Sequence, residues 1–209
     1  PNIGNFRSIS SKNGIGLGLG LPLDYRINSR LNISMAPGFL LFEGHGLTYT
    51  GTGPQGSTIR HQKVDENSTY NFSRFELPMH LKVRSDHKYL GTSKNSYKLY
   101  MLGGMKYSSH IGAKGYYEGK NVTGEQFDPT SSNVPLIVKY DFFSYEMGLG
   151  FDIYFTYFKL SPEIRFSQSI GNLLDKNHTY ANPSDYPNPF VNALDRLRLR
   201  SFQFSLIFE

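Results

Sequence analysis

The 209-residue chain contains no cysteine and no tryptophan. The absence of cysteine excludes disulfides, thiol catalysis and cysteine-based zinc sites, and it suits passage through an oxidising compartment. No stretch approaches the roughly 18 consecutive apolar residues of a membrane-spanning helix. The first residues also lack the basic segment followed by an apolar segment that marks a signal peptide.

Charge of one sign is only slightly in excess, with 22 Lys and Arg against 17 Asp and Glu. The basic residues are spread through the chain and are not gathered in one run, so the footprint of a nucleic-acid-binding protein is absent. Glycine, phenylalanine and tyrosine are abundant instead, at 21, 16 and 15 residues. We therefore expect no nucleic acid among the partners of this protein.

The stretch RFELPMHLKVR, residues 74–84, alternates strictly between two kinds of side chain. One parity is apolar, from Phe75 to Val83, and the other holds Pro78 and five charged or titratable residues. Successive side chains of a strand point to opposite faces of a sheet, so this period of two predicts a strand between two different media.

The same alternation recurs along the chain and predicts seven strands, without the spacing of an amphipathic helix in any of them. These strands cover residues 15–27, 31–42, 74–84, 97–107, 143–155, 158–170 and 201–208. Just before the last of them, Leu197 and Leu199 are out of phase with Phe202 and Phe204 of that strand. This predicts a β-bulge near Arg200 or Ser201, or a strand that rises beyond a membrane.

Short and long connections separate the strands in turn. The links near 28–29 and 154–157 are tight, whereas the long loops cover 43–69, 108–138 and 171–195, and residues 1–14 read as the end of another loop. Such alternation is typical of an up-and-down antiparallel outer-membrane barrel with short periplasmic turns and long outer loops. Because these barrels have even strand numbers, we expect one all-β domain over 1–209 that supplies seven of eight strands, with the first strand missing from this numbering.

A soluble barrel with an apolar interior would also alternate, and the polar parity decides between the two. Gly148 and Gly150 share that parity with Glu146 and Asp152. Small residues between charges of both signs suit the narrow lumen of an eight-stranded barrel, which has just enough room for its side chains. We therefore expect the apolar parity to face the lipid of a bacterial outer membrane.

The polar parity then supplies a set of charged lumen residues. The set comprises Arg74, Glu76, His80, Lys82, Arg84, Lys106, Glu146, Asp152, Lys159, Glu163 and Arg165. These side chains could line a conduit, but buried charges must be compensated, so we expect them to pair with each other and fill the lumen as a structural network.

Enzymatic and metal sites have little support in the sequence. His80 near Glu76 resembles a catalytic pair, as in a membrane hydrolase, but no G-x-S-x-G or comparable serine motif accompanies it. The six histidines show no H-E-x-x-H spacing. We expect no catalytic residue, no cofactor and no metal.

The long loops are the more promising functional surface, because long loops within a compact fold are usually functional or disordered. Their aromatic side chains are candidates for docking a partner such as a larger translocon barrel. These candidates are Tyr49, Tyr116, Tyr117, Phe127, Tyr180, Tyr186 and Phe190.

Four tracts resemble the PorT (SprT) family of Bacteroidota outer-membrane β-barrel proteins: residues 75–85, 100–107, 142–174 and 193–209. The most specific is GFDIYFTYFKLSPEIRFSQSIGNLL within the third tract. The resemblance implies a non-catalytic accessory or assembly component of the type IX secretion system, which exports proteins and supports gliding motility in some members. It also implies a larger membrane-protein complex as partner. The alternative is a small barrel of the OmpA/OmpX kind that serves envelope structure or adhesion through its loops.

Overall fold

A computed structural model describes residues 6–41, 46–52, 58–64, 73–89, 96–111, 138–139, 141–175 and 193–209. The regular secondary structure in these ranges consists of β-strands. In the same part of the chain, no helix is long and apolar enough to cross a membrane. The prediction of an all-β antiparallel fold is therefore confirmed.

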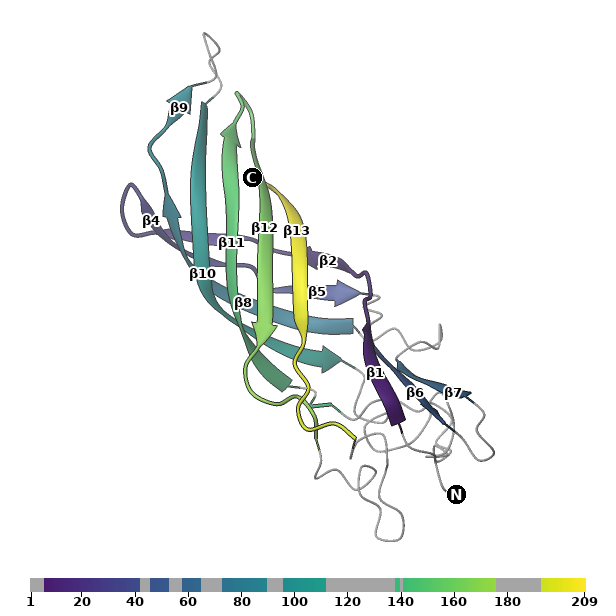
Figure 1. Ribbon diagram of the computed structural model, residues 1–209. Coiled ribbons are helices and arrows are strands. Elements are labelled where there is room, and N and C mark those ends of the chain that lie inside the picture. Colours follow the sequence, from purple (N-terminus) through teal and green to yellow (C-terminus); the bar gives the residue numbers. More distant parts are fainter. Residues whose placement is uncertain are drawn as a thin grey trace.

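Ten strands form one antiparallel sheet that curls into a half-barrel (Figure 1). They are β2 (Leu17–Gly20), β3 (Leu23–Arg26), β4 (Leu31–Met35), β5 (Gly38–Leu41), β8 (Ser73–Arg84), β9 (Lys88–Tyr89), β10 (Ser96–Ile111), β11 (Asp141–Tyr154), β12 (Lys159–Ser169) and β13 (Arg200–Phe208). The main path of the sheet runs β13-β12-β11-β10-β8-β4-β3, and β5 joins β2 to β8. Neighbouring strands are thus mostly consecutive in the chain, as in an up-and-down meander.

The seven predicted strands are all present, but the first two are each divided. Pro22 separates β2 from β3, and Pro37 separates β4 from β5. The two breaks lie side by side, since Leu21 N donates to Pro37 O at 2.9 Å. On the neighbouring strand β8, Pro78 lies between the residues paired with β4 and those paired with β5. Proline cannot donate to the ladder, so these three residues interrupt the hydrogen bonding at one level of the sheet.

The two ends of the barrel differ in their connections. Tight turns join β3 to β4 and β11 to β12, closed by Ile27 N to Leu31 O at 3.0 Å and Phe155 N to Phe158 O at 2.9 Å. We call this the turn end, and the opposite end, where the long connections begin, the loop end. The chain finishes at the turn end, where Lys159 N donates to Glu209 O at 2.7 Å.

The sheet has two edges, β13 on one side and the β2–β3 pair on the other. Both edges run from the loop end towards the turn end, so they have the same direction. A Cβ atom built on Gly18 would lie 4.0 Å from Gln203 Nε2, so a β13 side chain reaches towards β2 across the opening. Antiparallel closure would therefore require a strand of opposite direction between these edges.

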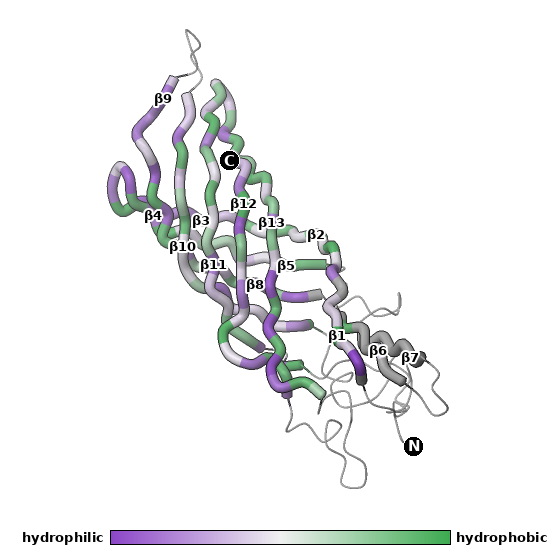
Figure 2. The backbone as a smooth tube through the Cα atoms, viewed as in Figure 1, coloured by the Kyte–Doolittle hydropathy of each residue, from purple (hydrophilic) through white to green (hydrophobic). Residues whose placement is uncertain are grey.

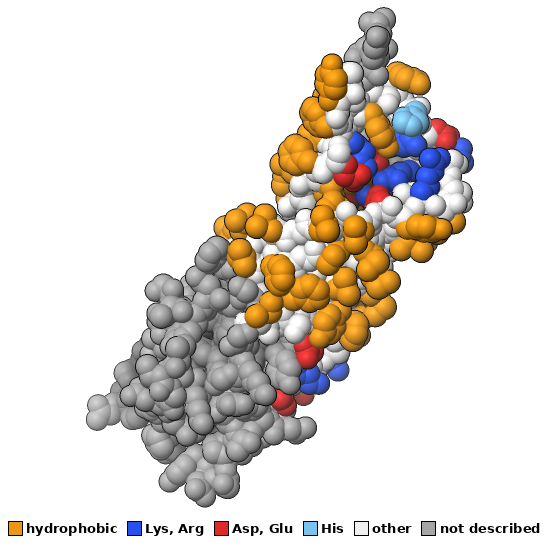
Figure 3. Space-filling view, turned by 180° about the vertical axis from the view of Figure 1, so that it is seen from behind, with side chains coloured by type: hydrophobic (Ala, Val, Ile, Leu, Met, Phe, Trp, Pro, Cys, Tyr) orange, Lys and Arg blue, Asp and Glu red, His pale blue; other side chains and the backbone are white. Residues whose placement is uncertain are grey.

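The two faces of the sheet are the reverse of those of a soluble protein. Apolar side chains of the outer face are exposed, such as Leu149 at 62% and Phe202 at 81%, whereas Lys106 at 2% and Asp152 at 0% are buried on the inner face. The alternation is visible along each strand in Figure 2, and apolar side chains cover the outer wall in Figure 3. The alternative of a soluble barrel with an apolar interior is therefore wrong.

A second sheet lies beside the loop end of the barrel (Figure 1). It contains β1 (Phe6–Lys12), β6 (Gly46–Thr52) and β7 (Thr58–Val64) in the order β1-β6-β7. We expected the end of a loop over 1–14 and a long loop over 43–69, but strands occupy part of both. The pairing of β1 with β6 explains the difference, because each satisfies its backbone hydrogen bonds on the other.

The prediction of a β-bulge near Arg200 or Ser201 is wrong. The pairing of β12 with β13 runs without a register shift from Leu160 opposite Phe208 to Gln168 opposite Arg200. Leu199 precedes the strand, and its N–H is bound by Ser169 Oγ at 2.9 Å. Leu197 and Leu199 therefore share the inward parity of Ser201, and Phe202 points to the opposite, outer face. The two leucines precede the strand at the loop end, beyond the polar part of the lumen.

An apolar cluster lies close to these leucines. Leu173 and Leu174 are 5% and 3% exposed. Leu173 N donates to Leu197 O at 3.0 Å, and Leu174 pairs with Val138 in an isolated bridge. Buried apolar side chains thus lie at the loop end, whereas the middle of the inner wall is charged.

Candidate functional site

The structure places all eleven predicted lumen residues on the inner face of the sheet. Nine are buried, and the side chains of the other two, Arg84 and Lys159, keep 10% and 14% exposure. They come from β8, β10, β11 and β12, whose alternation turns every second side chain inward. This inner face is the candidate functional site.

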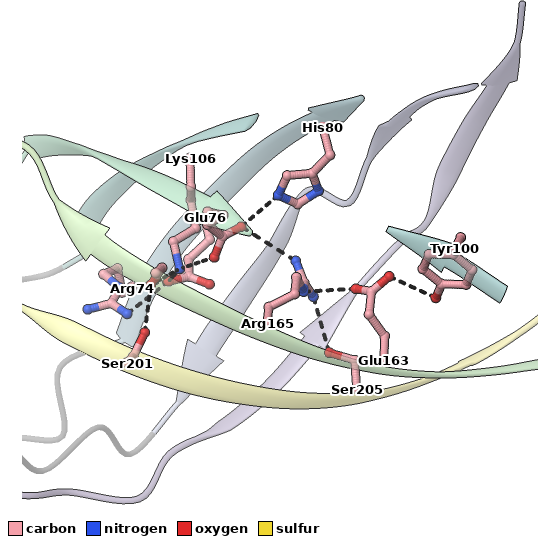
Figure 4. Close-up of polar contacts among 11 residues, drawn as sticks. Arg74, Glu76, His80, Tyr100, Lys106, Glu163, Arg165, Ser201 and Ser205 are labelled. Carbon is pink, nitrogen blue, oxygen red and sulfur yellow. Dashed lines mark hydrogen bonds and ion pairs between the residues drawn. The ribbon is translucent and has the colours of Figure 1, made fainter. Parts of the chain in front are cut away.

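Glu146 is the centre of the network, and Figure 4 labels its partners His80, Lys106 and Arg165. Its Oε1 lies 3.0 Å from Lys106 Nζ, and its Oε2 lies 2.8 Å from His80 Nε2 and 3.7 Å from Arg165 Nη1. The side chain of Glu146 is 1% exposed. One carboxylate on β11 thus connects β8, β10 and β12 across the lumen.

From this centre the network continues towards the loop end. Lys106 Nζ also lies 3.0 Å from Glu76 Oε1, and the same oxygen accepts from Arg74 Nη2 at 2.8 Å. Ser167 Oγ lies 2.7 Å from Ser201 Oγ, which joins β12 to β13 at this level. Acidic and basic groups alternate along this path, so each charge has a partner of opposite sign.

The path also continues towards the turn end. Arg165 Nε lies 2.9 Å from Glu163 Oε1, and Arg165 Nη2 donates to Ser205 Oγ at 3.1 Å. Glu163 Oε2 in turn accepts from Tyr100 Oη at 2.9 Å. Tyr100 is only 2% exposed, so its ring fills the lumen beside the ion pairs.

A second cluster surrounds Arg84 nearer the turn end. Arg84 Nη2 lies 2.6 Å from Asp24 Oδ2, and Arg84 Nε lies 2.9 Å from Asp152 Oδ2. Lys82 Nζ lies 3.4 Å from Asp24 Oδ2 and 4.3 Å from the centre of the Tyr100 ring. Asp24 and Tyr100 were not among the predicted site residues, although both occupy the polar parity of their strands, and that parity was the signal for them.

Glycine makes room for these side chains. A Cβ atom on Gly150 would lie 2.5 Å from Cζ and Oη of Tyr100, and one on Gly148 would lie 2.8 Å from Cγ of Arg165. Real Cβ atoms essentially never approach other atoms so closely. The two glycines of β11 therefore allow a tyrosine and an arginine to cross a narrow lumen.

His80 has a different partner from the one that its sequence position indicates. Its Nε2 contacts Glu146 from the neighbouring part of the sheet, and the residue is 4% exposed. General-base catalysis needs substrate within hydrogen-bond reach of the base, and here that nitrogen is occupied by a carboxylate. Among the described residues, no group of three His, Asp or Glu side chains could hold a metal ion.

The structure says little about the seven loop aromatics. Tyr49 belongs to β6, and its backbone lies opposite His61 of β7. The structure describes the backbone of Tyr49 but not its side chain. The other six, Tyr116, Tyr117, Phe127, Tyr180, Tyr186 and Phe190, lie outside the described residues. The docking role assigned to them stays a prediction.

A comparison with known protein families matches residues 2–175 to the outer membrane protein beta-barrel domain. The chain belongs to this family. It is an outer-membrane barrel, as the exposed apolar wall and the charged lumen indicate. No curated protein and no solved structure matches the chain. In barrels of this type the short turns face the periplasm and the long loops face outward, which orients the turn end and the loop end.

Proposed function

We propose that this outer-membrane barrel is a non-catalytic accessory or assembly component of a protein export route of the type IX kind. The four tracts that resemble the PorT family support this proposal. The most specific tract, residues 150–174, covers the last five residues of β11, the tight turn at 155–158 and all of β12. This tract supplies Asp152, Glu163 and Arg165 to the lumen network, so the resemblance includes residues of the candidate site.

The observation that carries the proposal is the filled lumen. The charged side chains bridge β3, β8, β10, β11 and β12 at distances of 2.6 to 3.7 Å between charged atoms. Barrels with about eight strands have an interior just wide enough for side chains, whereas water-filled channels need about 16. A protein cargo therefore does not pass through this lumen, and the barrel acts through its surfaces.

Two surfaces are available for a partner in the membrane. The outer wall presents large exposed side chains, among them Phe143 at 54%, Phe204 at 66% and Phe208 at 67%. The long loops carry the aromatic candidates. A larger translocon barrel docked against these surfaces would make the protein an assembly factor without any pore of its own.

The test is the secreted proteome of the native cell with and without the gene, with the wild-type gene restored in a third strain. We expect type IX cargo to disappear from the medium of the deletion strain, to accumulate in the periplasm, and to return on restoration. A fourth strain carrying Tyr116→Ala and Tyr117→Ala then tests the loops by copurification of the partner. Partner contacts found solely at the periplasmic turns would contradict docking through the loops or the wall.

Unchanged secretion would overturn the export role. The broad family match equally suits a small envelope barrel of the OmpA/OmpX kind, which acts in envelope structure or adhesion. In that case the deletion strain should show altered envelope integrity or surface binding while its secreted proteome stays the same.

A further inference from the structure

Charged side chains also gather at the turn end, where the lumen opens. Figure 3 shows Lys, Arg, Asp, Glu and His side chains in a hollow at this end, bordered by the apolar outer wall. We call this hollow the turn-end mouth. Its cations are Arg26, Lys82, Arg84, Lys98 and Lys159, and its carboxylates are Asp24, Asp152 and Glu209.

The three carboxylates of the mouth already have partners. Asp24 contacts Lys82 and Arg84, and Asp152 contacts Arg84 and accepts from Ser161 Oγ at 2.6 Å. The Oε2 atom of Glu209 lies 2.6 Å from Lys159 Nζ. Five cations against three carboxylates leave the mouth with an excess of positive charge.

Two of the cations carry this excess. Arg26 is exposed, and within the described part of the chain its Nε donates only to the carbonyl oxygen of Asn28 at 3.1 Å. Lys98 lies opposite Asp152 in the β10–β11 register, on the inward parity of Tyr100, and forms no ion pair with any described residue. Neither cation is therefore neutralised by the described part of the chain.

The position of these cations restricts what can bind them. They lie on the inner wall, which faces away from the lipid headgroups around the barrel. Lys88, in contrast, lies opposite Tyr97 on the outer parity. The turn end opens to the periplasm. A positively charged cleft with low-dielectric walls concentrates anionic groups that approach from that side.

We propose that the turn-end mouth binds an acidic segment of a periplasmic protein, whose carboxylates contact Arg26 and Lys98. Such a segment would neutralise the two unpaired cations without disturbing the buried pairs around Arg84 and Glu146. The interaction surface is distinct from the loops and the outer wall, and it does not depend on the export role.

The experiment uses the full chain, folded in nanodiscs of zwitterionic lipid, and a fluorescent peptide of ten glutamates as the probe. We expect salt-sensitive binding, weakened about tenfold in the R26Q/K98Q variant because two charge contacts are lost. The charge-conserving R26K/K98R variant and the outer-wall variant K88Q should bind like the wild type. A lysine peptide of the same length is the control for nonspecific adsorption.

The proposal is overturned if the glutamate peptide does not bind, or if R26Q/K98Q binds it as tightly as the wild type. An equal loss in K88Q would show general attraction to the whole end and would also overturn it. If only vesicles of phosphatidylglycerol bind, and R26Q/K98Q abolishes that binding, the ligand is an anionic membrane. The single variants R26Q and K98Q provide the same test if the double variant fails to fold.

Discussion

The middle of the lumen and its turn-end mouth contain the same kinds of side chain in different states. In the middle, Glu146 and Lys106 are almost completely buried, and each contacts groups of opposite charge. Beside the mouth, at the turn end, Arg30 and Asp86 form an ion pair although their side chains are 64% and 72% exposed, and Arg26 of the mouth has no acidic partner among the described residues. Burial, and not residue type, therefore separates charges that hold the strands together from charges that remain available to a ligand.

The largest expected effect comes from the centre of the buried network. Glu146→Gln removes the charge that faces Lys106, His80 and Arg165, so it leaves buried cations without compensation. We expect a loss of about 3 to 5 kcal/mol in the free energy of unfolding, the usual cost of breaking a buried ion pair from one side. Denaturant unfolding in lipid vesicles measures it.

Glu209→Gln is the matched control, since Glu209 pairs with Lys159 but its side chain is 37% exposed. We expect that variant to lose less than about 1 kcal/mol, as for ion pairs accessible to water. Equal losses in the two variants would contradict the distinction between the middle and the mouth.

The next effect tests the opposite wall of the same strand. Leu149 lies on β11 between two inward residues and is itself 62% exposed on the outer face. Leu149→Arg should cost about 2 to 4 kcal/mol if this face lies near the middle of the bilayer. Ile27→Arg, at the tight turn between β3 and β4, should cost about 1 kcal/mol or less because charge is tolerated near the membrane surface.

Unfolding of both variants in the same vesicles provides the comparison. A Leu149→Arg variant as stable as the wild type would mean that this wall does not contact hydrocarbon.

A smaller effect concerns packing in the lumen. Gly150→Ala places a Cβ atom 2.5 Å from the Tyr100 ring, so the ring and its hydrogen bond to Glu163 must shift. We expect a loss of about 1 to 3 kcal/mol, typical of overpacking.

Gly103→Ala serves as the control, because its added Cβ atom would face outward with only Glu146 O nearby, at 3.9 Å. The same unfolding midpoint for both alanine variants would show that the lumen has spare room at Gly150.

The smallest effect is expected beside the mouth, at the turn end. Arg30 contacts Asp86 through two hydrogen bonds, Nε to Oδ1 at 3.1 Å and Nη2 to Oδ2 at 2.7 Å. Because both side chains are exposed, Arg30→Gln should change the free energy of unfolding by less than about 1 kcal/mol, and added salt should reduce the difference further. A loss of stability as large as that of Glu146→Gln would show that burial does not explain the difference between the buried and the exposed ion pairs.

Much of the fold could be predicted from the order of residues alone. The period of two in residues 74–84 places Glu76 and Lys82 on one face and Met79 and Leu81 on the other, whatever surrounds the strand. The proline positions were visible too, but not their effect. Pro22, Pro37 and Pro78 are far apart in the sequence, and only strand pairing brings them to one level of the sheet.

The site was predictable to a similar extent. Alternation selected the inward charges but not their partners, and the folded sheet brings His80 to Glu146, 66 residues away. Asp24, which completes the cluster around Arg84, has the same inward parity, although the predicted set did not include it. Local periodicity reports the direction of a side chain, but the partner depends on the register between strands.

The division between sequence and structure follows from this. Alternation in the chain establishes which side chains face lipid and which face the lumen, because the geometry of a strand permits only two directions. Strand register and sheet curvature decide which charges meet, which glycine lies under the Tyr100 ring, and which cations remain free at the turn-end mouth. Those features depend on contacts between strands, so they exist only once the sheet has formed.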